Sequence, residues 1–219
     1  MSYCVAIPAF NAARTIKETL DSVLNQSVAP SEIVVVDDGS SDDTPDIVAQ
    51  YGADVRLIRQ QNAGCGAATT AAIMATSAPV VAMVDADDVW LPEKMERQLA
   101  RLDQLGARSL VFARIQQFPH GDSDRTAGKV RDGLMRSTMV MARSAFDAVG
   151  PIIDPPGGCG DMVDWIGRAR GLGFAVDVLP EVLAQRRIIA GSMTYAMTAE
   201  QNRGYLAVAR AAILRRRQG

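Results

Sequence analysis

The amino-acid sequence predicts an α/β domain with a mostly parallel central sheet and helices on both faces of that sheet. Short apolar runs alternate with segments in which apolar residues recur at helical spacing, and the links between them are short. Polar or acidic residues follow directly after three of the apolar runs. With 219 residues, of which 48% are hydrophobic, the chain can bury the core of one domain.

The first half of the chain shows the strand–helix alternation of such a sheet. We expect strands at residues 4–7, 33–36, 55–58, 80–84 and 110–115. The run at 33–36 is continuous and β-branched, as in a strand that is buried on both faces. Helices are expected at 16–24, from Pro45 onward, from about Gly64 to Ala75, and from Pro92 to Leu105. Short links of this kind give parallel strands with right-handed crossovers.

The second half of the chain is less regular. Residues 121–132 are polar and contain glycine, which predicts an exposed loop, and residues 155–158 (Pro-Pro-Gly-Gly) must also form a loop. We expect a short strand at 139–142, a helix at 161–172, a strand at 175–179 and a terminal helix at 198–217. Because no linker separates the halves, we predict one domain over 1–219, with a half at 1–118, a smaller half at 119–197 and a C-terminal helix at 198–219.

Composition excludes several classes of function. The formal net charge of −2 gives no bulk field that favours nucleic acid or an anionic membrane. The three cysteines have neither metal-site nor redox-motif spacing, so we expect a reducing, cytoplasmic compartment. No targeting segment is evident, and no run of eighteen apolar residues predicts a membrane span.

The functional signal lies in the loops that follow three predicted strands. Right-handed crossovers place these loops at one edge of the sheet, where open parallel sheets bind their ligands. Carboxylates packed this closely repel one another unless a cation lies among them, and Mg²⁺ or Mn²⁺ held by one or two carboxylates plus substrate phosphates is the usual solution. The loops are Pro8-Ala9-Phe10-Asn11, Asp37-Asp38-Gly39-Ser40 and Asp85-Ala86-Asp87-Asp88.

These motifs resemble the family 2 glycosyltransferases of the GT-A fold. The resemblance rests on residues 6–11 (Ala-Ile-Pro-Ala-Phe-Asn), on residues 35–44 (Val-Val-Asp-Asp-Gly-Ser-Ser-Asp-Asp-Thr) and on residues 84–88 (Val-Asp-Ala-Asp-Asp). Their order and spacing agree with the family over roughly the first hundred residues, and the similarity resumes more weakly at 158–187. The resemblance implies a Rossmann-like half that binds a nucleotide sugar (1–118) and a half that carries the acceptor side and the catalytic base (119–197).

The resemblance also implies roles for single residues. Asp38 would accept a hydrogen bond from the base of a uridine-type donor, and Gly64 would let the backbone approach the nucleotide. Asp87 would bind a Mn²⁺ or Mg²⁺ ion that bridges the diphosphate, and Asp88 could share that task. The full set of implied donor-binding residues is Pro8, Ala9, Phe10, Asn11, Asp38, Gly64, Asp85, Ala86 and Asp87.

The catalytic base is expected near the start of the helix at 161–172. Members of the family invert the anomeric centre with the Asp of a Glu-Asp pair that precedes a Trp-bearing helix. The matching stretch here, residues 158–165, reads Gly-Cys-Gly-Asp-Met-Val-Asp-Trp and has no Glu-Asp pair. We therefore predict Asp161 as the base, with Asp164 as its substitute at i, i+3 on the same helix face. Trp165 is expected in the core.

Departures from the family pattern keep a second interpretation open. Where the family often has Arg-Arg-Ile-His, residues 186–189 read Arg-Arg-Ile-Ile, and Ala68-Thr69-Thr70 stands where Ala-Arg-Asn is usual. The alternative is a catalytically impaired protein of the same fold that binds nucleotide sugars or acts as a scaffold. The acid-rich motif at 85–89 is also similar to the Asp-x-Asp-x-Val motif of haloacid-dehalogenase-type phosphatases. There the motif follows the first strand, whereas here three predicted strands come before the strand that it follows.

Partners are predicted only by class. The acceptor could be a glycan, a peptide, a lipid carrier or a small molecule, and nucleic acid is not expected. The basic C-terminal tail could contact a membrane peripherally, although packing on its own domain is the favoured prediction. The sequence says nothing of the oligomeric state.

Overall fold

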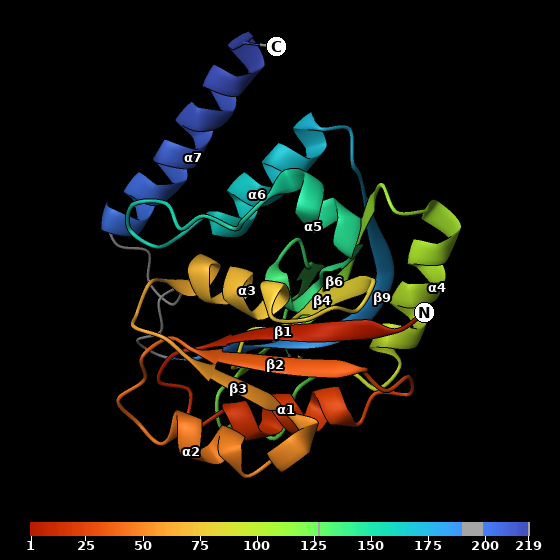
Figure 1. Cartoon of the computed structure of the whole chain (residues 1–219), viewed down its shortest axis with the longest axis vertical. Coiled ribbons are helices and arrows are strands. Elements are labelled where there is room, and N and C mark those ends of the chain that lie inside the picture. Colours follow the sequence, from red (N-terminus) through yellow and green to blue (C-terminus); the bar gives the residue numbers. More distant parts are fainter. Residues whose placement is uncertain (127, 190–198, 219) are drawn as a thin grey trace.

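In the part of the chain that the structure describes, a mixed sheet of nine strands forms the centre, with helices on both of its faces (Figure 1). This computed structural model describes residues 1–126, 128–189 and 199–218, the side chains of 199–202 and 216–218 excepted. The strand order is β3-β2-β1-β4-β8-β6-β9-β5, and β7 pairs with β6 outside this path. The prediction of an α/β fold is confirmed.

Four neighbouring parallel strands make up the first half of the sheet. They are β1 (Tyr3–Ala9), β2 (Glu32–Asp37), β3 (Arg56–Arg59) and β4 (Val80–Met83). Strand β1 lies between β2 and β4 and is parallel to both, and β3 is parallel to β2. Each of these strands lies within two residues of its predicted position.

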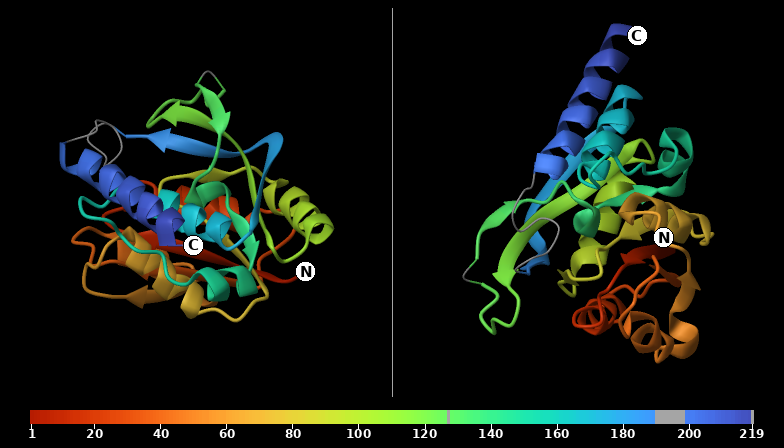
Figure 2. Two further views of the ribbon diagram at one scale, coloured as in Figure 1. Left: turned by 90° about the horizontal axis from the view of Figure 1, so that it is seen from above. Right: turned by 90° about the vertical axis from the view of Figure 1, so that its left-hand side faces the viewer.

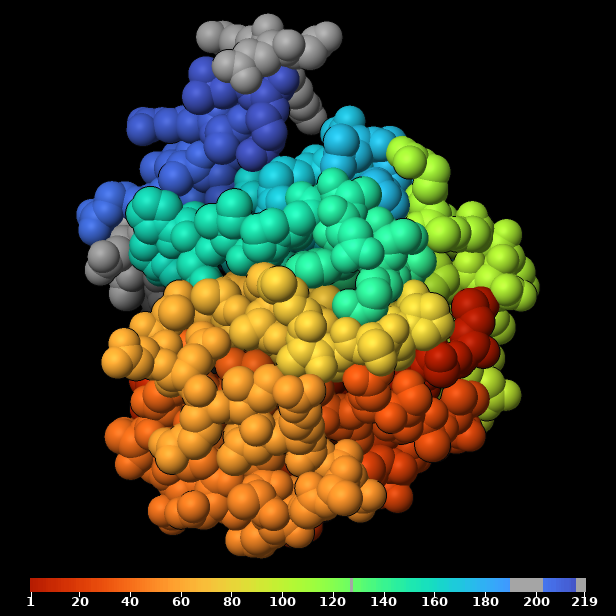
Figure 3. Space-filling view, in the orientation of Figure 1, coloured from red at the N-terminus to blue at the C-terminus, as the bar shows by residue number. Residues whose placement is uncertain are grey.

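Alternate residues of β1 supply two separate hydrophobic cores. Tyr3, Val5 and Ile7 pack on one face with helices α1 (Ile16–Leu24), α2 (Thr44–Ala49) and α4 (Lys94–Leu105). Cys4 and Ala6 pack on the other face with α3 (Cys65–Met74), α5 (Arg143–Val149) and α6 (Asp161–Gly171). This period of two, with both faces buried, explains why the strand reads as a continuous apolar run. Figure 3 shows α3, α5 and α6 as a continuous layer over one face.

The second half of the sheet differs from the prediction. Strand β6 (Ser109–Pro119) pairs in parallel with β9 (Ala175–Ile188), which is far longer than the predicted strand at 175–179. Strand β8 (Val140–Ala142) is antiparallel to both β4 and β6. The predicted loop at 121–132 ends in β7 (Val130–Asp132), which is antiparallel to β6. Helix α5 and strand β5 (Val89–Trp90) were not predicted at all.

The C-terminal helix α7 (Ala199–Gln218) lies against α6 and projects beyond the rest of the fold (Figures 1 and 2). The residue predicted to begin it, Thr198, lies outside the described residues. None of the helices in the described ranges combines the length and the apolar character that crossing a bilayer requires.

Lys94 is a fully buried cation in the core between α4 and the sheet. Its ammonium lies 3.8 Å from the centre of the Trp90 ring, and its polar contact is the sulfur of Met95 at 3.6 Å. Burial lowers the pKa of Lys94 well below its ordinary value. The Trp90 ring therefore offsets the cost of burying this charge only in part.

We expect Lys94→Met to stabilise the protein. A gain of roughly 1–3 kcal/mol in the free energy of unfolding at pH 7 is expected, because burying a polar amine costs free energy that a methionine of similar length does not. A lysine whose folded pKa is lowered binds fewer protons when folded, so wild-type stability rises with pH up to the ordinary lysine pKa. The gain should therefore shrink between pH 7 and pH 10 in urea titrations. A variant less stable than wild type at pH 7 would contradict this view of Lys94.

Candidate functional site

The carboxyl ends of β1, β2 and β4 meet at one edge of the sheet. Ala9 at the end of β1 is in register with Asp37 at the end of β2, and Ala6 is in register with Met83 at the end of β4. The amide of Asp38 donates to the carbonyl of Ala9 at 2.8 Å. The three polar loops are thus neighbours, as the strand order of an open parallel sheet requires.

The loop after β1 presents an aromatic ring and is fixed by an amide side chain. Pro8 and Ala9 are buried as the last residues of β1, whereas Phe10 is 52% exposed. Asn11 has a left-handed backbone (φ 49°), which asparagine tolerates better than most residues. The side-chain Oδ1 of Asn11 accepts a hydrogen bond from the backbone amide of Ser41 at 2.9 Å. The backbone amide of Asn11 donates to Oγ of Ser40, also at 2.9 Å.

Asp38 fixes the loop that leads into helix α3. The residue is buried, and its carboxylate accepts hydrogen bonds from Gln60 Nε2 (2.7 Å) and from the amides of Ala63 and Gly64 (both 2.9 Å). A carboxylate offers about four acceptor positions. Three are used here, so one of the four positions is not used by the described part of the protein.

Gly64 gives room to another protein group. It begins α3 with φ 101°, and a Cβ at this position would lie 2.6 Å from Oδ2 of Asp154. The Asp154 carboxylate accepts hydrogen bonds from the amides of Gly66 (2.8 Å) and Ala67 (3.0 Å). A carboxylate at a helix N-terminus is stabilised by the unpaired amides and the helix dipole. The loop at 152–160 is thereby attached to α3 beside the site.

The acidic loop after β4 is anchored from several sides. Two threonines at the start of α1 hold its backbone: Thr15, the residue before the helix, donates from Oγ1 to the carbonyl of Ala86 (2.9 Å), and Thr19 Oγ1 donates to that of Asp88 (2.8 Å). Asp88 is buried and accepts hydrogen bonds from Ser137 Oγ and from the amide of Arg187. Burial raises the pKa of Asp88 well above its ordinary value, and the charges of Asp87 and Asp85 add to the shift. Through its hydrogen bonds with Ser137 and Arg187, Asp88 holds the acidic loop in place.

Asp87 has the environment of a cation ligand. Burial, and secondly the charge of Asp85, raise its pKa to about 6. A largely buried carboxylate with a second carboxylate nearby gains from a divalent cation beside it. Among the described residues, no three His, Cys, Asp or Glu side chains converge as a complete metal cage. The arrangement fits Mg²⁺ or Mn²⁺ held by one or two carboxylates with phosphate oxygens of a ligand.

Arg136 joins the acidic loop to the second half of the chain. It lies in the 3₁₀ turn η2 (Arg136–Thr138) and is only 5% exposed. Its guanidinium donates to Oδ1 of Asp85 at 2.5 Å and to Oδ2 of Asp161. Its Nε is buried without a partner in the described part of the protein. Sequence reasoning did not identify Arg136, because its partners lie 51 and 25 residues away.

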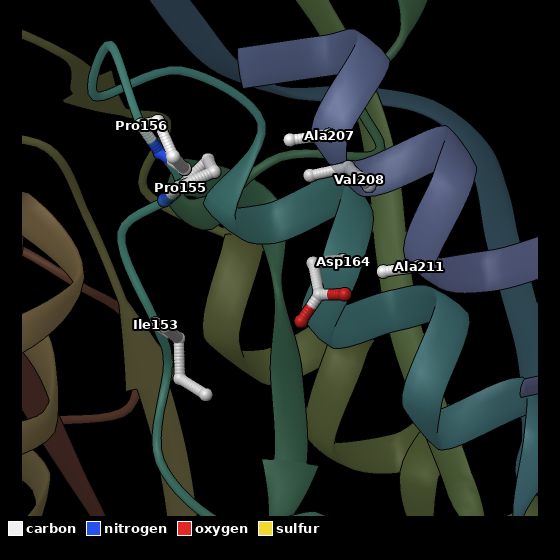
Figure 4. A pocket seen from close by; sticks show the side chains of 7 residues that line it. All are labelled: Ile153, Pro155, Pro156, Asp164, Ala207, Val208 and Ala211. Carbon is white, nitrogen blue, oxygen red and sulfur yellow. The ribbon is translucent and has the colours of Figure 1, made fainter. Parts of the chain in front are cut away.

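The structure separates the two predicted candidates for the base. Asp161 begins α6, and Arg136 ties its side chain to Asp85. Asp164 instead accepts hydrogen bonds from Arg168 Nε (2.9 Å) and from Arg215 of α7 (2.8 Å). It lines a pocket between the loop at 153–156 and α7, which Figure 4 shows with Ala207 and Ala211. The two residues therefore face different surroundings, although they lie at i, i+3.

Arg187 of β9 supports the acidic loop from the other side. It is buried, and its Nε donates to the carbonyl of Asp87 at 2.9 Å. Its NH2 donates to Glu18 of α1, which Arg125 also contacts. Burial tends to raise the pKa of Glu18, but hydrogen bonds from the two arginines hold it below its ordinary value. Arg186, the next residue, is close enough for its charge to lower the pKa of Asp87.

The tryptophan of α6, the single histidine and the three cysteines are not among the predicted site residues. Trp165 is fully buried, as predicted, and its Nε1 donates to the carbonyl of Gly150 at 2.8 Å. His120 is exposed, and its Nδ1 lies 3.4 Å from Arg187 NH1. Cys4, Cys65 and Cys159 are free thiols, and burial raises the pKa of each.

Comparison with known proteins supports the relationship that the motifs suggested. The profile of the family described as "Glycosyl transferase family 2" matches residues 4–152. An uncharacterized glycosyltransferase of Nostoc sp. is 41% identical over 101 residues, which cover 44% of this chain and 31% of that protein. The succinoglycan biosynthesis protein ExoO of Rhizobium meliloti is 39% identical over 107 residues, covering 48% and 31%. This chain thus spans less than a third of the length of these two relatives.

A solved structure matches nearly the whole chain. Residues 1–349 of S. aureus TarS, in complex with UDP-GlcNAc, give a TM-score of 0.78 at 20% sequence identity. The match covers 98% of this chain and 66% of the TarS chain. It confirms the GT-A-type fold that the sequence predicted.

The raised pKa of Asp87 predicts a stability effect that can be measured without substrate. A carboxyl whose folded pKa lies above its unfolded value loses stability as pH rises from about 4 to about 6. In EDTA, Asp87→Asn should remove this loss and melt roughly 2–4 °C above wild type at pH 7.

The control is Asp103→Asn, which changes an exposed carboxylate of α4. This variant should follow the wild-type melting temperature between pH 4 and pH 7. Equal melting temperatures of Asp87→Asn and wild type throughout this range would show that Asp87 is not desolvated.

Proposed function

Since this chain belongs to glycosyl transferase family 2, we propose that it transfers a sugar from a nucleoside-diphosphate donor to an acceptor hydroxyl, with inversion at the anomeric carbon. The observation that carries the proposal is the shared edge of the sheet, where an exposed Phe10, an anchored Asp38 and the acidic loop meet. A UDP-sugar is the favoured donor, because Asp38 keeps one acceptor position for a base N–H and because TarS, which shares the fold, binds UDP-GlcNAc.

The loops at this edge suit the parts of such a donor. Phe10 offers an exposed ring for contact with the base, beside the backbone of Pro8 and Ala9 and the fixed amide of Asn11. Asp85 would face the ribose or the sugar, and Asp87 would hold Mn²⁺ or Mg²⁺ at the diphosphate. When bound, such an ion would stabilise the negative charge that develops on the departing diphosphate. Gly64, which leaves room for the Asp154 carboxylate, and Ala86, whose carbonyl Thr15 holds, would contribute backbone to the donor site.

Asp161 is the proposed general base. In the transfer, the acceptor oxygen forms a bond to the anomeric carbon while the bond from that carbon to the diphosphate oxygen breaks. The proton of the acceptor hydroxyl passes to the carboxylate of Asp161. Arg136 would hold this carboxylate next to Asp85, which places the base beside the sugar end of the donor.

A second candidate function has its own observation. The ion pair with Arg136 occupies one oxygen of Asp161, so that oxygen is already used within the protein. The Glu-Asp pair of the family is also missing from residues 158–165. A protein of this fold that binds nucleotide sugars without turning them over would show the same donor loops. Donor turnover separates the two functions.

The acceptor is proposed only as a chemical class, and the cellular location only as a compartment. A glycan, a peptide, a lipid carrier or a small molecule with a free hydroxyl would fit the chemistry. Three free thiols without disulfides support a reducing, cytoplasmic location.

Donor binding can be tested by calorimetric titration of UDP with and without Mn²⁺. Wild-type protein should bind UDP at least tenfold more tightly with Mn²⁺, and Asp87→Ala should lose that gain because it removes the proposed cation ligand. Asp103→Ala should behave as wild type. If UDP and the other nucleoside diphosphates failed to bind in every condition, the motifs would serve the fold alone.

The base can be assigned by comparing Asp161→Asn with Asp164→Asn, a matched pair on one helix. Release of UDP from UDP-GlcNAc, with water or a panel of sugar acceptors, is measured for both variants. Loss of a general base should lower kcat by about 10²–10⁴-fold in Asp161→Asn, with KM for the donor little changed. Asp164→Asn should stay within about threefold of wild type. The reverse pattern would assign the base to Asp164, and turnover by neither wild type nor variants would favour the binding function.

A further inference from the structure

The outer face of helix α7 combines exposed apolar side chains with arginines. Leu206, Ile213 and Leu214 are 57%, 52% and 56% exposed, and their spacing of seven and eight residues places them on one side of the helix. Arg203 and Arg210 are also exposed and share this side. We call these five residues the outer stripe of α7. Large apolar side chains gathered in this way on one exposed face are typical of an interaction surface.

The opposite face of α7 holds the helix on the domain. Gly204 and Val208 are buried, and a Cβ at Gly204 would lie 2.6 Å from the carbonyl oxygen of Cys159. Arg215 donates to Asp164 of α6 at 2.8 Å. These contacts fix the rotation of α7 about its axis, so the outer stripe points away from the body of the protein.

Charge is distributed unevenly between α7 and the rest of the chain. Residues 203–219 contain five arginines and none of the 25 acidic residues. The chain as a whole has a net charge of −2, so the remainder is acidic and α7 is a cationic arm on an acidic body. The overall charge conceals this asymmetry, which is why composition alone gave no reason to expect an anionic partner.

We propose that the outer stripe of α7 docks the protein on the surface of a bilayer that contains anionic lipid. A helix with apolar and basic residues on one face lies in the plane of the interface, with its apolar side chains among the acyl chains and its cations at the phosphates. Arg203 and Arg210 flank the leucines, and a long arginine side chain can reach the headgroups while its stem stays in apolar surroundings. Because α7 projects beyond the fold, a flat surface can approach it (Figure 2).

A second copy of this chain is a poorer match to the same stripe. Two such helices would bring exposed arginines of like charge together in an apolar contact, with no acidic residue in 203–219 to pair with them. Lipid phosphates supply the complementary charge that residues 203–219 of a second copy lack. The proposal does not depend on sugar transfer, since it concerns the face of α7 that lies away from the strand-end loops.

Co-sedimentation with vesicles tests the proposal. Vesicles of phosphatidylcholine alone are compared with vesicles that also contain phosphatidylglycerol. The 219-residue chain should bind the anionic vesicles at least tenfold more tightly, and added salt should weaken the binding. The double variant Arg203→Gln/Arg210→Gln should lose roughly fivefold per arginine. The triple variant Leu206→Ser/Ile213→Ser/Leu214→Ser should lose binding to both kinds of vesicle.

A matched triple variant controls for the general effect of exposed apolar residues. Met74, Leu105 and Leu172 are exposed on other elements, and their joint replacement by Ser should leave vesicle binding unchanged. Circular dichroism and UDP binding, measured on every variant, show that the fold and the donor site are intact, independently of the result with vesicles. Equal binding of the two triple variants would overturn the proposal. A dimer in light scattering that Leu206→Ser/Ile213→Ser/Leu214→Ser converts to a monomer, without vesicle binding by wild type, would assign the stripe to a second copy.

Discussion

The site depends on one buried arginine between two carboxylates. Arg136 is 5% exposed and contacts Asp85, at the end of the parallel half of the sheet, and Asp161, at the start of α6. A guanidinium stays protonated under all physiological conditions, so its burial requires these charges. The same requirement draws the donor loops and the proposed base together, because the loss of either carboxylate would leave the buried guanidinium with only one of its two counter-charges. The contact that anchors Arg136 therefore sets the geometry of the proposed chemistry.

Further hydrogen bonds from several elements hold the acidic loop at residues 85–88. Thr15 and Thr19 hold its backbone from α1, and Ser137, the neighbour of Arg136, donates to Asp88. Arg187 of β9 holds the other side of the loop, because its backbone amide donates to Asp88 and its Nε donates to the carbonyl of Asp87. Because most of the polar groups of the loop are used within the protein, Asp87 is left as the member best suited to bind a cation. A loop that is held rigidly, and that keeps the carboxylate of Asp87 for binding, is suited to positioning a charged ligand.

The parallel half of the fold could be predicted because its signals are local. Strands buried on both faces read as continuous apolar runs, and each is followed by residues that turn the chain at the sheet edge. The acidic motifs lie in these turns, so the same short segments predicted both the fold class and the edge of the sheet proposed to bind the donor. The resemblance of residues 6–11, 35–44 and 84–88 to known glycosyltransferases supplied the proposed roles.

The second half could not be predicted because long-range contacts define it. Strand β5 has two residues and exists through its pairing with β9, almost a hundred residues later in the sequence. Strand β9 continues past Pro180 and Glu181 with many half-exposed positions, and a register shift against β6 hides any regular alternation. Arg136 lies in a short turn that gives no periodic signal. The separation of Asp161 from Asp164 likewise depends on Arg136 and Arg215, which arrive from distant elements.

A double-mutant cycle between Arg136 and Asp161 tests the central claim most directly. The free energy of unfolding is measured in urea for wild type, Arg136→Met, Asp161→Asn and the double variant. If the buried ion pair joins the two halves of the site, the two changes should be coupled by about 1.5–3 kcal/mol. Effects that add to within about 0.5 kcal/mol would show that Arg136 and Asp161 act independently, and the proposed link between the donor loops and the base would be wrong.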